Sequence, residues 1–197
     1  RGESKRRGTP NYEYKILGYR EDGADVEEYS VSLGDMFLTD MKIDVSPKKD
    51  IVCAGFYSEK GTFSIKGTYY LRIDRKSKEI ERISSKEFDI DFITMNFTEG
   101  QERRAKKREA KGKNVELYEY DLRDLVPRAD GGAVLLAEQY YITVVCTTDP
   151  KTGQTRCTYY YHYNDIIVVS VDPDGQIEWA TKVSKRQTSA NDGGYFS

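Results

Sequence analysis

A segment of strand-like sequence occurs twice in this chain, and this repeat limits the folds that the chain can adopt. The first copy comprises residues 50–57, 69–74 and 78–81, and the second comprises residues 132–141, 167–172 and 175–179. Each copy reads as a strand, an excursion, a strand that ends in Asp, a tight turn, and a strand that opens with Ile-Glu. Because one such unit cannot bury its own apolar face, the repeat predicts stacked or radial β-architecture.

We therefore predict an all-β fold of antiparallel four-stranded units that is β-propeller-like, with a β-sandwich as the alternative. The units are expected at residues 36–84 and 115–183 of a β-repeat domain spanning 11–197, and residues 1–10 as a linker or frayed N-terminus. A closed propeller needs about four blades, so two units cannot close a ring. We expect the 197-residue chain to be part of a longer one, or its edges to pair with partners.

A helical insertion is predicted between the two units, over residues 85–113. Ser84 and Glu87 have the spacing of a capping box, which marks a helix start. Four apolar residues then fall on one helical face: Phe88, Phe92, Ile93 and Phe97. A basic run follows, which either binds an acidic partner or is a solvated charged segment; its members are Arg103, Arg104, Lys106, Lys107, Arg108, Lys111 and Lys113. No aromatic residue interleaves with this run, and the formal net charge is only −2, so we expect no nucleic-acid partner.

The three cysteines bear on the redox compartment. Cys146 and Cys157 flank residues 149–153, whose Pro and Gly are typical of a turn. If Asp149 faces Gln154, counting outward along an antiparallel ladder places Cys146 opposite Cys157, within disulfide range. A disulfide would imply the periplasm, the cell surface or the exterior, whereas two free thiols would fit a cytosolic hairpin. Cys53 lies in an apolar strand and is expected to be an inert core thiol.

The same hairpin is unusually rich in tyrosine, a residue that occurs 16 times in the chain. Exposed tyrosines supply rigid contact area at low entropic cost, so we predict an interaction hairpin that binds protein or sugar. Its residues are Tyr140, Tyr141, Tyr159, Tyr160, Tyr161, His162 and Tyr163. The alternative is that these tyrosines pack across strands and onto neighbouring blades.

Catalytic and metal-binding patterns are weak. His162 is the single histidine, and a catalytic triad would need it together with Asp165 as the orienting carboxylate. Zinc-ligand spacings and a glycine-rich phosphate loop are absent from the sequence. Residues 172–175 form only a fragment of a calcium loop, without the Glu that would complete it, and a β-turn explains them better. Glu138 and Asp165 would oppose each other in the hairpin register, at a separation approaching that of a retaining glycosidase pair. We predict no cofactor and no metal.

Four segments carry a family resemblance. Residues 164–169, 172–179 and 191–196, together with 54–58 before the strand 69–74, resemble uncharacterised Bacteroidetes cell-envelope proteins with propeller-like β-repeats. The resemblance covers most of residues 44–197 and implies secretion or surface exposure, often as a lipoprotein. A lipobox cysteine is absent from this sequence, so any lipoprotein anchor would lie outside it. The resemblance implies no catalytic residue.

These observations predict a non-catalytic binding or scaffold module of a cell-envelope or surface assembly, located in the periplasm, at the cell surface or outside the cell. Other envelope proteins are the expected partners. The alternative is a carbohydrate-binding or carbohydrate-active β-propeller whose ligand is a glycan. The sequence holds no apolar run of about 18 residues, so we expect no transmembrane segment.

Overall fold

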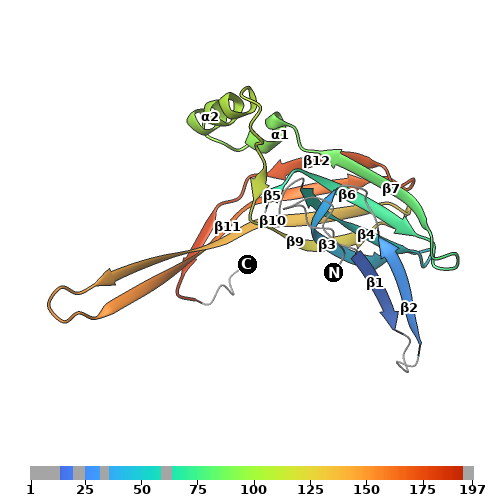
Figure 1. Ribbon diagram of the computed structural model, residues 1–197, viewed down its shortest axis with the longest axis horizontal. Coiled ribbons are helices and arrows are strands. Elements are labelled where there is room, and N and C mark those ends of the chain that lie inside the picture. The colour runs from blue at the N-terminus through green and yellow to red at the C-terminus, as the bar shows by residue number, and fades with distance from the viewer. Residues whose placement is uncertain (1–13, 20–24, 32–35, 59–63, 193–197) are drawn as a thin grey trace, which may run out of the picture.

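The structure is a computed structural model that describes residues 14–19, 25–31, 36–58 and 64–192. The predicted linker at residues 1–10 and the last part of the resembling segment, residues 193–196, lie outside the described residues. Antiparallel strands dominate the structure. Two helices lie side by side, and in the sequence they separate the strands of the first main sheet from those of the second (Figure 1). The all-β class and the single helical insertion are confirmed, and the described part of the chain forms neither a closed barrel nor a propeller.

The first main sheet is an antiparallel meander of four strands in the order β3-β4-β6-β7. Its strands are β3 (Phe37–Val45), β4 (Ile51–Ser58), β6 (Gly67–Ile73) and β7 (Ile80–Glu87). Two short strands, β5 (Ser64–Ile65) and β8 (Leu117–Tyr118), pair with each other beside it. Strand β4 is buried on both faces, which explains why its sequence is a continuous apolar run rather than an alternating one.

The second main sheet is also an antiparallel meander, in the order β9-β10-β11-β12. Its strands are β9 (Tyr120–Pro127), β10 (Ala133–Thr148), β11 (Thr155–Val171) and β12 (Ile177–Val183). A further strand, β13 (Gln187–Ala190), pairs with the outer part of β11. Strands β10 and β11 are about twice as long as their neighbours, so their distal halves extend beyond the sheet as a two-stranded arm (Figure 1).

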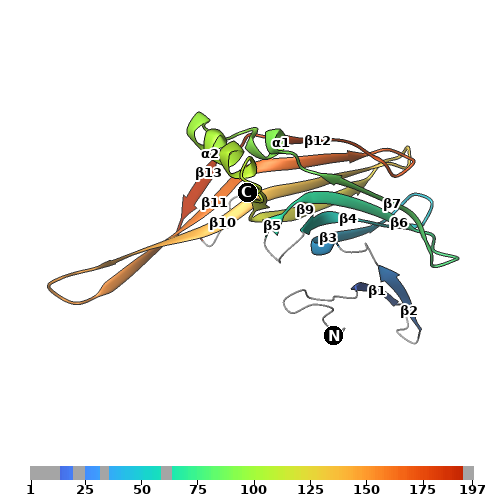
Figure 2. The same cartoon turned by 45° about the horizontal axis from the view of Figure 1, so that its top comes forward.

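The two sheets face each other across a common apolar core, and a third layer lies on the outer face of the first sheet (Figure 2). Side chains of β4 alternate between the layers: Val52, Ala54 and Phe56 point into the core between the sheets, whereas Cys53 and Tyr57 point to the third layer. That third layer is the hairpin of β1 (Tyr14–Tyr19) and β2 (Val26–Val31), which contributes Ile16, Tyr29 and Val31 to a second apolar cluster. The chain is therefore layered and built around two cores.

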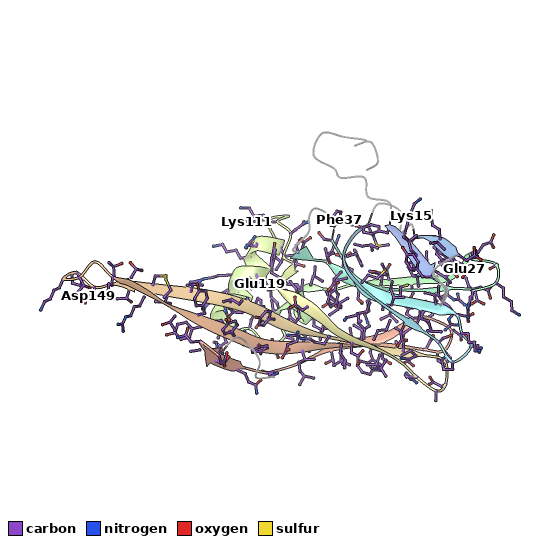
Figure 3. All side chains as sticks on the ribbon, turned by 90° about the horizontal axis from the view of Figure 1, so that it is seen from below. Lys15, Glu27, Phe37, Lys111, Glu119 and Asp149 are labelled. Carbon is purple, nitrogen blue, oxygen red and sulfur yellow. A yellow bond between two sulfur atoms is a disulfide. The ribbon has the colours of Figure 1, made fainter. Side chains whose placement is uncertain are left out.

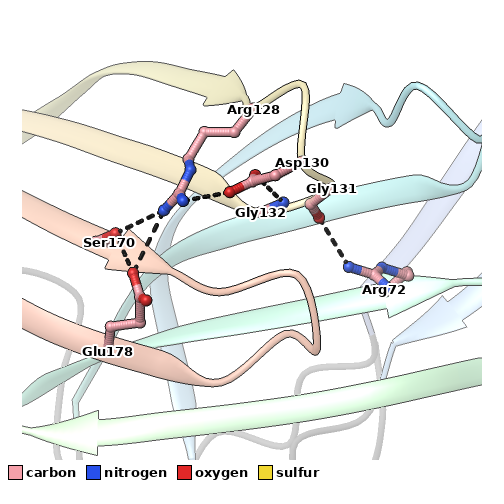
Figure 4. A network of polar contacts seen from close by, with 7 residues as sticks. All are labelled: Arg72, Arg128, Asp130, Gly131, Gly132, Ser170 and Glu178. Carbon is pink, nitrogen blue, oxygen red and sulfur yellow. Dashed lines mark hydrogen bonds and ion pairs between the residues drawn. The ribbon is translucent and has the colours of Figure 1, made fainter.

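Two arginines, Arg72 and Arg128, form a polar network at the turns that join β9 to β10 and β11 to β12 (Figure 4). Arg72 of β6 donates hydrogen bonds from Nη2 to the carbonyl oxygens of Gly131 and Pro173, at 3.1 and 3.0 Å. These carbonyls belong to the β9–β10 and β11–β12 turns, so one side chain of the first sheet holds both turns of the second. Arg128 adds contacts with Ser170, Glu178 and Asp130 within the second sheet.

The helical insertion begins later than the sequence pattern indicates. Ser84 and Glu87, predicted as a capping box, lie in β7, where pairing with β6 overrides the local helix signal. The first helix, α1 (Ile90–Thr94), is capped by Asp89, and the second, α2 (Glu99–Glu109), is capped by a capping box of Thr98 and Gln101. Neither of these described helices is long and apolar enough to cross a membrane.

Lys182 of β12 attaches the helices to the second sheet. Its Nζ donates a hydrogen bond of 2.8 Å to the carbonyl oxygen of Ile93 and lies over the rings of Phe92 and Phe97. Burial lowers the pKa of this ammonium group, although the charge of Asp165 partly offsets the effect. The basic run continues away from this contact along α2, where Lys106 pairs with Asp91 and Glu102.

The buried thiol of Cys53 should make the protein less stable at alkaline pH. Burial raises the pKa of Cys53 from its ordinary value of 9.0 to about 12. In the unfolded chain the thiol ionises first, so stability should fall as the pH rises from about 9 to about 12. Urea unfolding across this range should give a shallower fall for Cys53→Ala than for the wild type. Equal slopes, or reaction of the native protein with a thiol reagent, would contradict the burial of Cys53.

Candidate functional site

The distal halves of β10 and β11 form the arm, which we define as residues 140–163. Its ladder runs without interruption from the pair Tyr140 and Tyr163 to the pair Thr148 and Thr155. The turn at the tip is held by Asp149, whose carboxylate accepts hydrogen bonds from the backbone N–H groups of Lys151 and Thr152. The backbone N–H of Asp149 donates to the carbonyl oxygen of Gln154, as the predicted register requires.

A disulfide closes the arm near its tip. Cys146 and Cys157 are directly opposed, with their Cα atoms 4.0 Å apart, and their sulfur atoms are bonded. The disulfide predicted from the turn sequence is confirmed. It covalently fixes the register of the arm beyond the last contact with the body of the protein.

Removal of this disulfide should loosen the arm and spare the body. A loop of this size contributes about 3 kcal/mol on the chain-entropy model, and the tip packs against no core. In the Cys146→Ser/Cys157→Ser variant, hydrogen exchange of residues 147–156 should accelerate strongly while the main melting transition moves little. A large fall in the melting temperature, or unchanged exchange at the tip, would contradict this division between arm and body.

The two faces of the arm carry different side chains. One face carries the disulfide with Tyr140, Ile142, Val144, Tyr159, Tyr161 and Tyr163. The other carries Tyr141, Thr143, Val145, Thr158, Tyr160 and His162. Apolar side chains on both faces are exposed: the exposed fractions are 46% for Ile142, 49% for Val144, 54% for Val145 and 47% for Tyr159. Of the predicted interaction residues, only Tyr163 is buried.

His162 is held by neutral partners. Its Nε2 lies 2.8 Å from Oγ1 of Thr143, its Nδ1 lies 3.2 Å from Oγ1 of Thr188 on β13, and its ring stacks on Tyr141. Within the described residues neither ring nitrogen contacts a carboxylate, so the arrangement lacks the orienting acid that a catalytic triad needs. The histidine instead connects β13 to the arm.

A cleft of about 640 Å³ lies where the arm leaves the body. At its floor Glu138 has a side chain that is 8% exposed and accepts hydrogen bonds from Arg123 Nε, at 2.9 Å, and Lys185 Nζ, at 2.6 Å. The two cations in turn lie near aromatic rings, Arg123 over Tyr140 and Lys185 near Tyr163. The cleft therefore joins a buried, fully paired carboxylate to two tyrosine rings.

The predicted opposition of Glu138 and Asp165 is wrong. The β10–β11 register shifts between Glu138 and Tyr140, so Glu138 faces Ile166 rather than Asp165. The bulge adds one residue to β11, so Glu138 and Asp165 no longer lie opposite each other. Asp165 accepts a hydrogen bond from the backbone N–H of Lys185, and Glu138 is occupied by Arg123 and Lys185. Glu138 and Asp165 therefore do not form the directly opposed pair that the hairpin register predicts.

No group of three potential metal-ligating side chains occurs within the ranges that the structure describes. The calcium-like segment 172–175 is a β-turn, with Gly175 at φ 78° and its N–H donating to the carbonyl oxygen of Asp172. A second, polar cleft of about 420 Å³ lies between α1, the end of α2 and residues 113–116. It contains Glu116, whose Oε1 is buried without a partner.

Comparisons with protein-family models, curated proteins and solved structures find no match. The structure brings the tyrosines and His162 together on the arm, as the hairpin pattern predicts. Arg123 and Lys185 are additional cleft residues that the pattern does not single out, because isolated cations 15 and 47 residues from Glu138 carry no local signal.

Proposed function

We propose that this protein is a non-catalytic binding module of a cell-envelope or surface assembly, and that the arm is its contact element for protein partners. The observation that carries this proposal is the combination of exposed apolar side chains with a covalently closed ladder. Residues 140–163 contain only three charged side chains, those of Asp149, Lys151 and Arg156. Depletion of charge and enrichment in tyrosine are typical of the centres of protein interfaces.

Preorganisation adds to this support. An exposed hairpin of two strands is marginally stable in water by itself, so it would be a poor binding element. Here the disulfide, the stacking of Tyr141 on His162, and β13 hold the arm in one conformation before a partner arrives. A rigid arm loses little conformational entropy on binding. The disulfide also supports an oxidising location, in the periplasm, at the cell surface or outside the cell.

The two similar meanders support a propeller-like repeat. Each has four antiparallel strands in chain order, apart from the short β5, and the turn before the last strand of each copy follows an Asp. We propose that they correspond to two blade-like units of a repeat that further chain would extend. A longer version of the chain that forms a closed ring of such units would support this, and one that leaves the two sheets as an isolated sandwich would not.

Affinity isolation from the native envelope tests the proposed function. The wild type, a Tyr159→Ala/Tyr161→Ala variant and a Tyr118→Ala variant serve as bait; Tyr118 is a matched control because it is 53% exposed on β8, outside the arm. We expect stoichiometric partners that survive high salt with the wild type and the control, and their loss with the arm variant. Tyrosine truncation at an interface centre costs about 2 kcal/mol or more per residue, so the loss should be clear. Equal recovery by all three baits would refute the role of the arm.

A second candidate function is glycan binding in the basal cleft. The observation that favours it is the placement of the Tyr140 and Tyr163 rings, with centroids 5.0 Å apart, beside the hydrogen-bonding groups of Arg123 and Lys185. Aromatic rings next to fixed polar groups suit a sugar. Calorimetry against a polysaccharide panel, with Arg123→Met as the comparison, tests it: binding that the substitution abolishes supports the candidate, and no binding across the panel removes it.

A further inference from the structure

The long edge of β10 is open along the arm. Strand β9 covers this edge of β10 only as far as the pair Gln139 and Tyr120, and the next contact is the bond from the Tyr140 N–H to the Glu119 carbonyl oxygen. Beyond that point, no strand of the described residues pairs with the edge, which continues to Thr148 (Figure 1). Strand β11 and β13 lie on the other side of β10.

The direction of the backbone groups on this edge follows from two hydrogen bonds. The N–H of Tyr140 points away from β11, toward β9, whereas the N–H of Asp149 points toward β11. Since backbone groups alternate in direction along a strand, the even-numbered residues of β10 in the arm direct their N–H and C=O groups outward, away from β11. The outward residues are Ile142, Val144, Cys146 and Thr148.

This edge lacks the usual protection against pairing. Protected edges carry charged residues, prolines or bulges. The edge strand β7 of the first sheet fits that pattern, with Glu81, Arg82 and Lys86 along it. Residues 140–148 contain no charged residue and no proline, and their ladder with β11 has no bulge. The open edge is therefore a template for another strand.

We propose that the occupant of this edge is the same edge of a second copy of the chain, paired antiparallel about a two-fold axis. Opposite charges favour this partner. The tip of the arm carries two exposed cations, Lys151 and Arg156, against one acid, Asp149, whose carboxylate is bonded within the turn, and the base carries the exposed acids Glu119 and Asp121. The tip, marked by Asp149, and the base, marked by Glu119, lie at the two ends of the arm (Figure 3). Antiparallel pairing places the tip of each arm at the base of the other.

One register satisfies all the outward groups without disturbing the body. If Val144 faces Cys146 of the second copy, Ile142 faces its Thr148, and every outward residue of both edges is paired. Shifting the copies one pair closer to the body would set Thr148 against Tyr140, whose N–H is already bonded to Glu119. In the favoured register, the turn of one arm ends beside Glu119 of the other, so Lys151 can pair with that carboxylate.

The inference rests on the proposed function, because both treat the arm as an interaction element, and it adds the identity of one partner. A two-fold axis perpendicular to the sheet keeps equivalent faces on the same side. The pair would therefore present the tyrosines of two arms as one continuous surface. A partner with two matching sites would bind such a surface by avidity.

Sedimentation equilibrium of the 197-residue chain, in buffer that contains neither an oxidant nor a reductant, tests the inference. We expect a reversible dimer. Val144→Pro removes an outward N–H but no bond to β11, and should weaken dimerisation about tenfold or more, because both copies lose a hydrogen bond. Val144→Thr retains the N–H and should dimerise like the wild type. Melting temperature and Trp179 fluorescence establish that each variant is folded.

A charge exchange gives an independent readout. Lys151→Glu should weaken the dimer, and addition of Glu119→Lys in the same chain should restore it, because each tip would again meet an opposite charge. A wild type that stays monomeric at high concentration, or a Val144→Pro variant that dimerises like the wild type, would overturn the inference. Those outcomes would leave the proposed function standing if affinity isolation still depended on Tyr159 and Tyr161. If the wild type dimerises but recovers no other protein when it is used as bait, that result would support the inference and count against the proposed function.

Discussion

Replacement of Gly55 by alanine is expected to destabilise the protein severely, by about 3 kcal/mol or more. A Cβ at this position would lie 2.1 Å from the carbonyl oxygen of Asp40 and 2.9 Å from its carbonyl carbon. The cause is a bulge in β3: Leu38 faces Tyr57 and Asp40 faces Phe56, so Thr39 is extra and the strand bends toward β4. The three nearest atoms are all backbone atoms of Asp40 and Met41, so no flexible side chain could move aside.

Asp40, which follows the bulge, also connects β3 to β6 and β9. Asp40 accepts a hydrogen bond from the buried Tyr69 through its carbonyl oxygen, and from the N–H of Leu122 in β9 through its carboxylate. Moving Asp40 to make room for a methyl group would disturb both contacts, one in the first sheet and one between the sheets.

Gly100→Ala is the matched control for this substitution. Gly100 lies in α2 and a Cβ there would meet nothing within 4 Å. Alanine is favoured over glycine in a helix by about 1 kcal/mol, so this variant should be as stable as the wild type or more stable. Urea unfolding measures both variants. A Gly55→Ala protein with wild-type stability would mean that the β3 bulge is not as described.

The second large effect is expected from removing both cations that pair with Glu138. In an Arg123→Met/Lys185→Met variant the carboxylate at the floor of the cleft would stay buried without a partner, and such a loss costs about 3–5 kcal/mol. Urea unfolding of the wild type and the double variant at neutral pH measures this loss.

Removal of the carboxylate provides the control. Addition of Glu138→Leu to the double variant eliminates the unpaired charge and should recover most of the lost stability, since apolar replacement of a buried ion pair is often neutral. If the double variant unfolds like the wild type at neutral pH, or if the triple variant recovers nothing, the paired carboxylate is not the stabilising element of the cleft.

Local patterns predicted the parts of this molecule that local geometry determines. The turn at residues 149–153 fixes the register of the nearest ladder, so counting along two strands was sufficient to place Cys146 opposite Cys157. The same counting failed at Glu138, because the bulge beyond Tyr140 shifts the register and nothing in residues 138–140 or 163–166 marks it. Register errors of this kind arise wherever an unmarked bulge interrupts a ladder.

Tertiary pairing explains the other differences. Ser84 and Glu87 have helix-start spacing, yet β6 extends far enough to pair with residues up to Glu87 and keeps them in a strand. The helix start at Thr98 has an equally local signal, the capping box with Gln101, and no strand competes with it. Arg123 and Lys185 reach Glu138 from β9 and from the segment after β12, so only the folded arrangement of the sheet brings them together.

Site-specific photo-crosslinking in the native envelope tests the central claim, that the arm is the contact element, most directly. A photoreactive amino acid replaces Tyr161 on the arm or, as control, the exposed Tyr19 on β1, away from the arm. We predict discrete cross-linked species from position 161, distinguishable by mass as a second copy or another protein, and none from position 19. Absence of cross-links from position 161, or the same species from both positions, would contradict the assignment of the arm as the binding element.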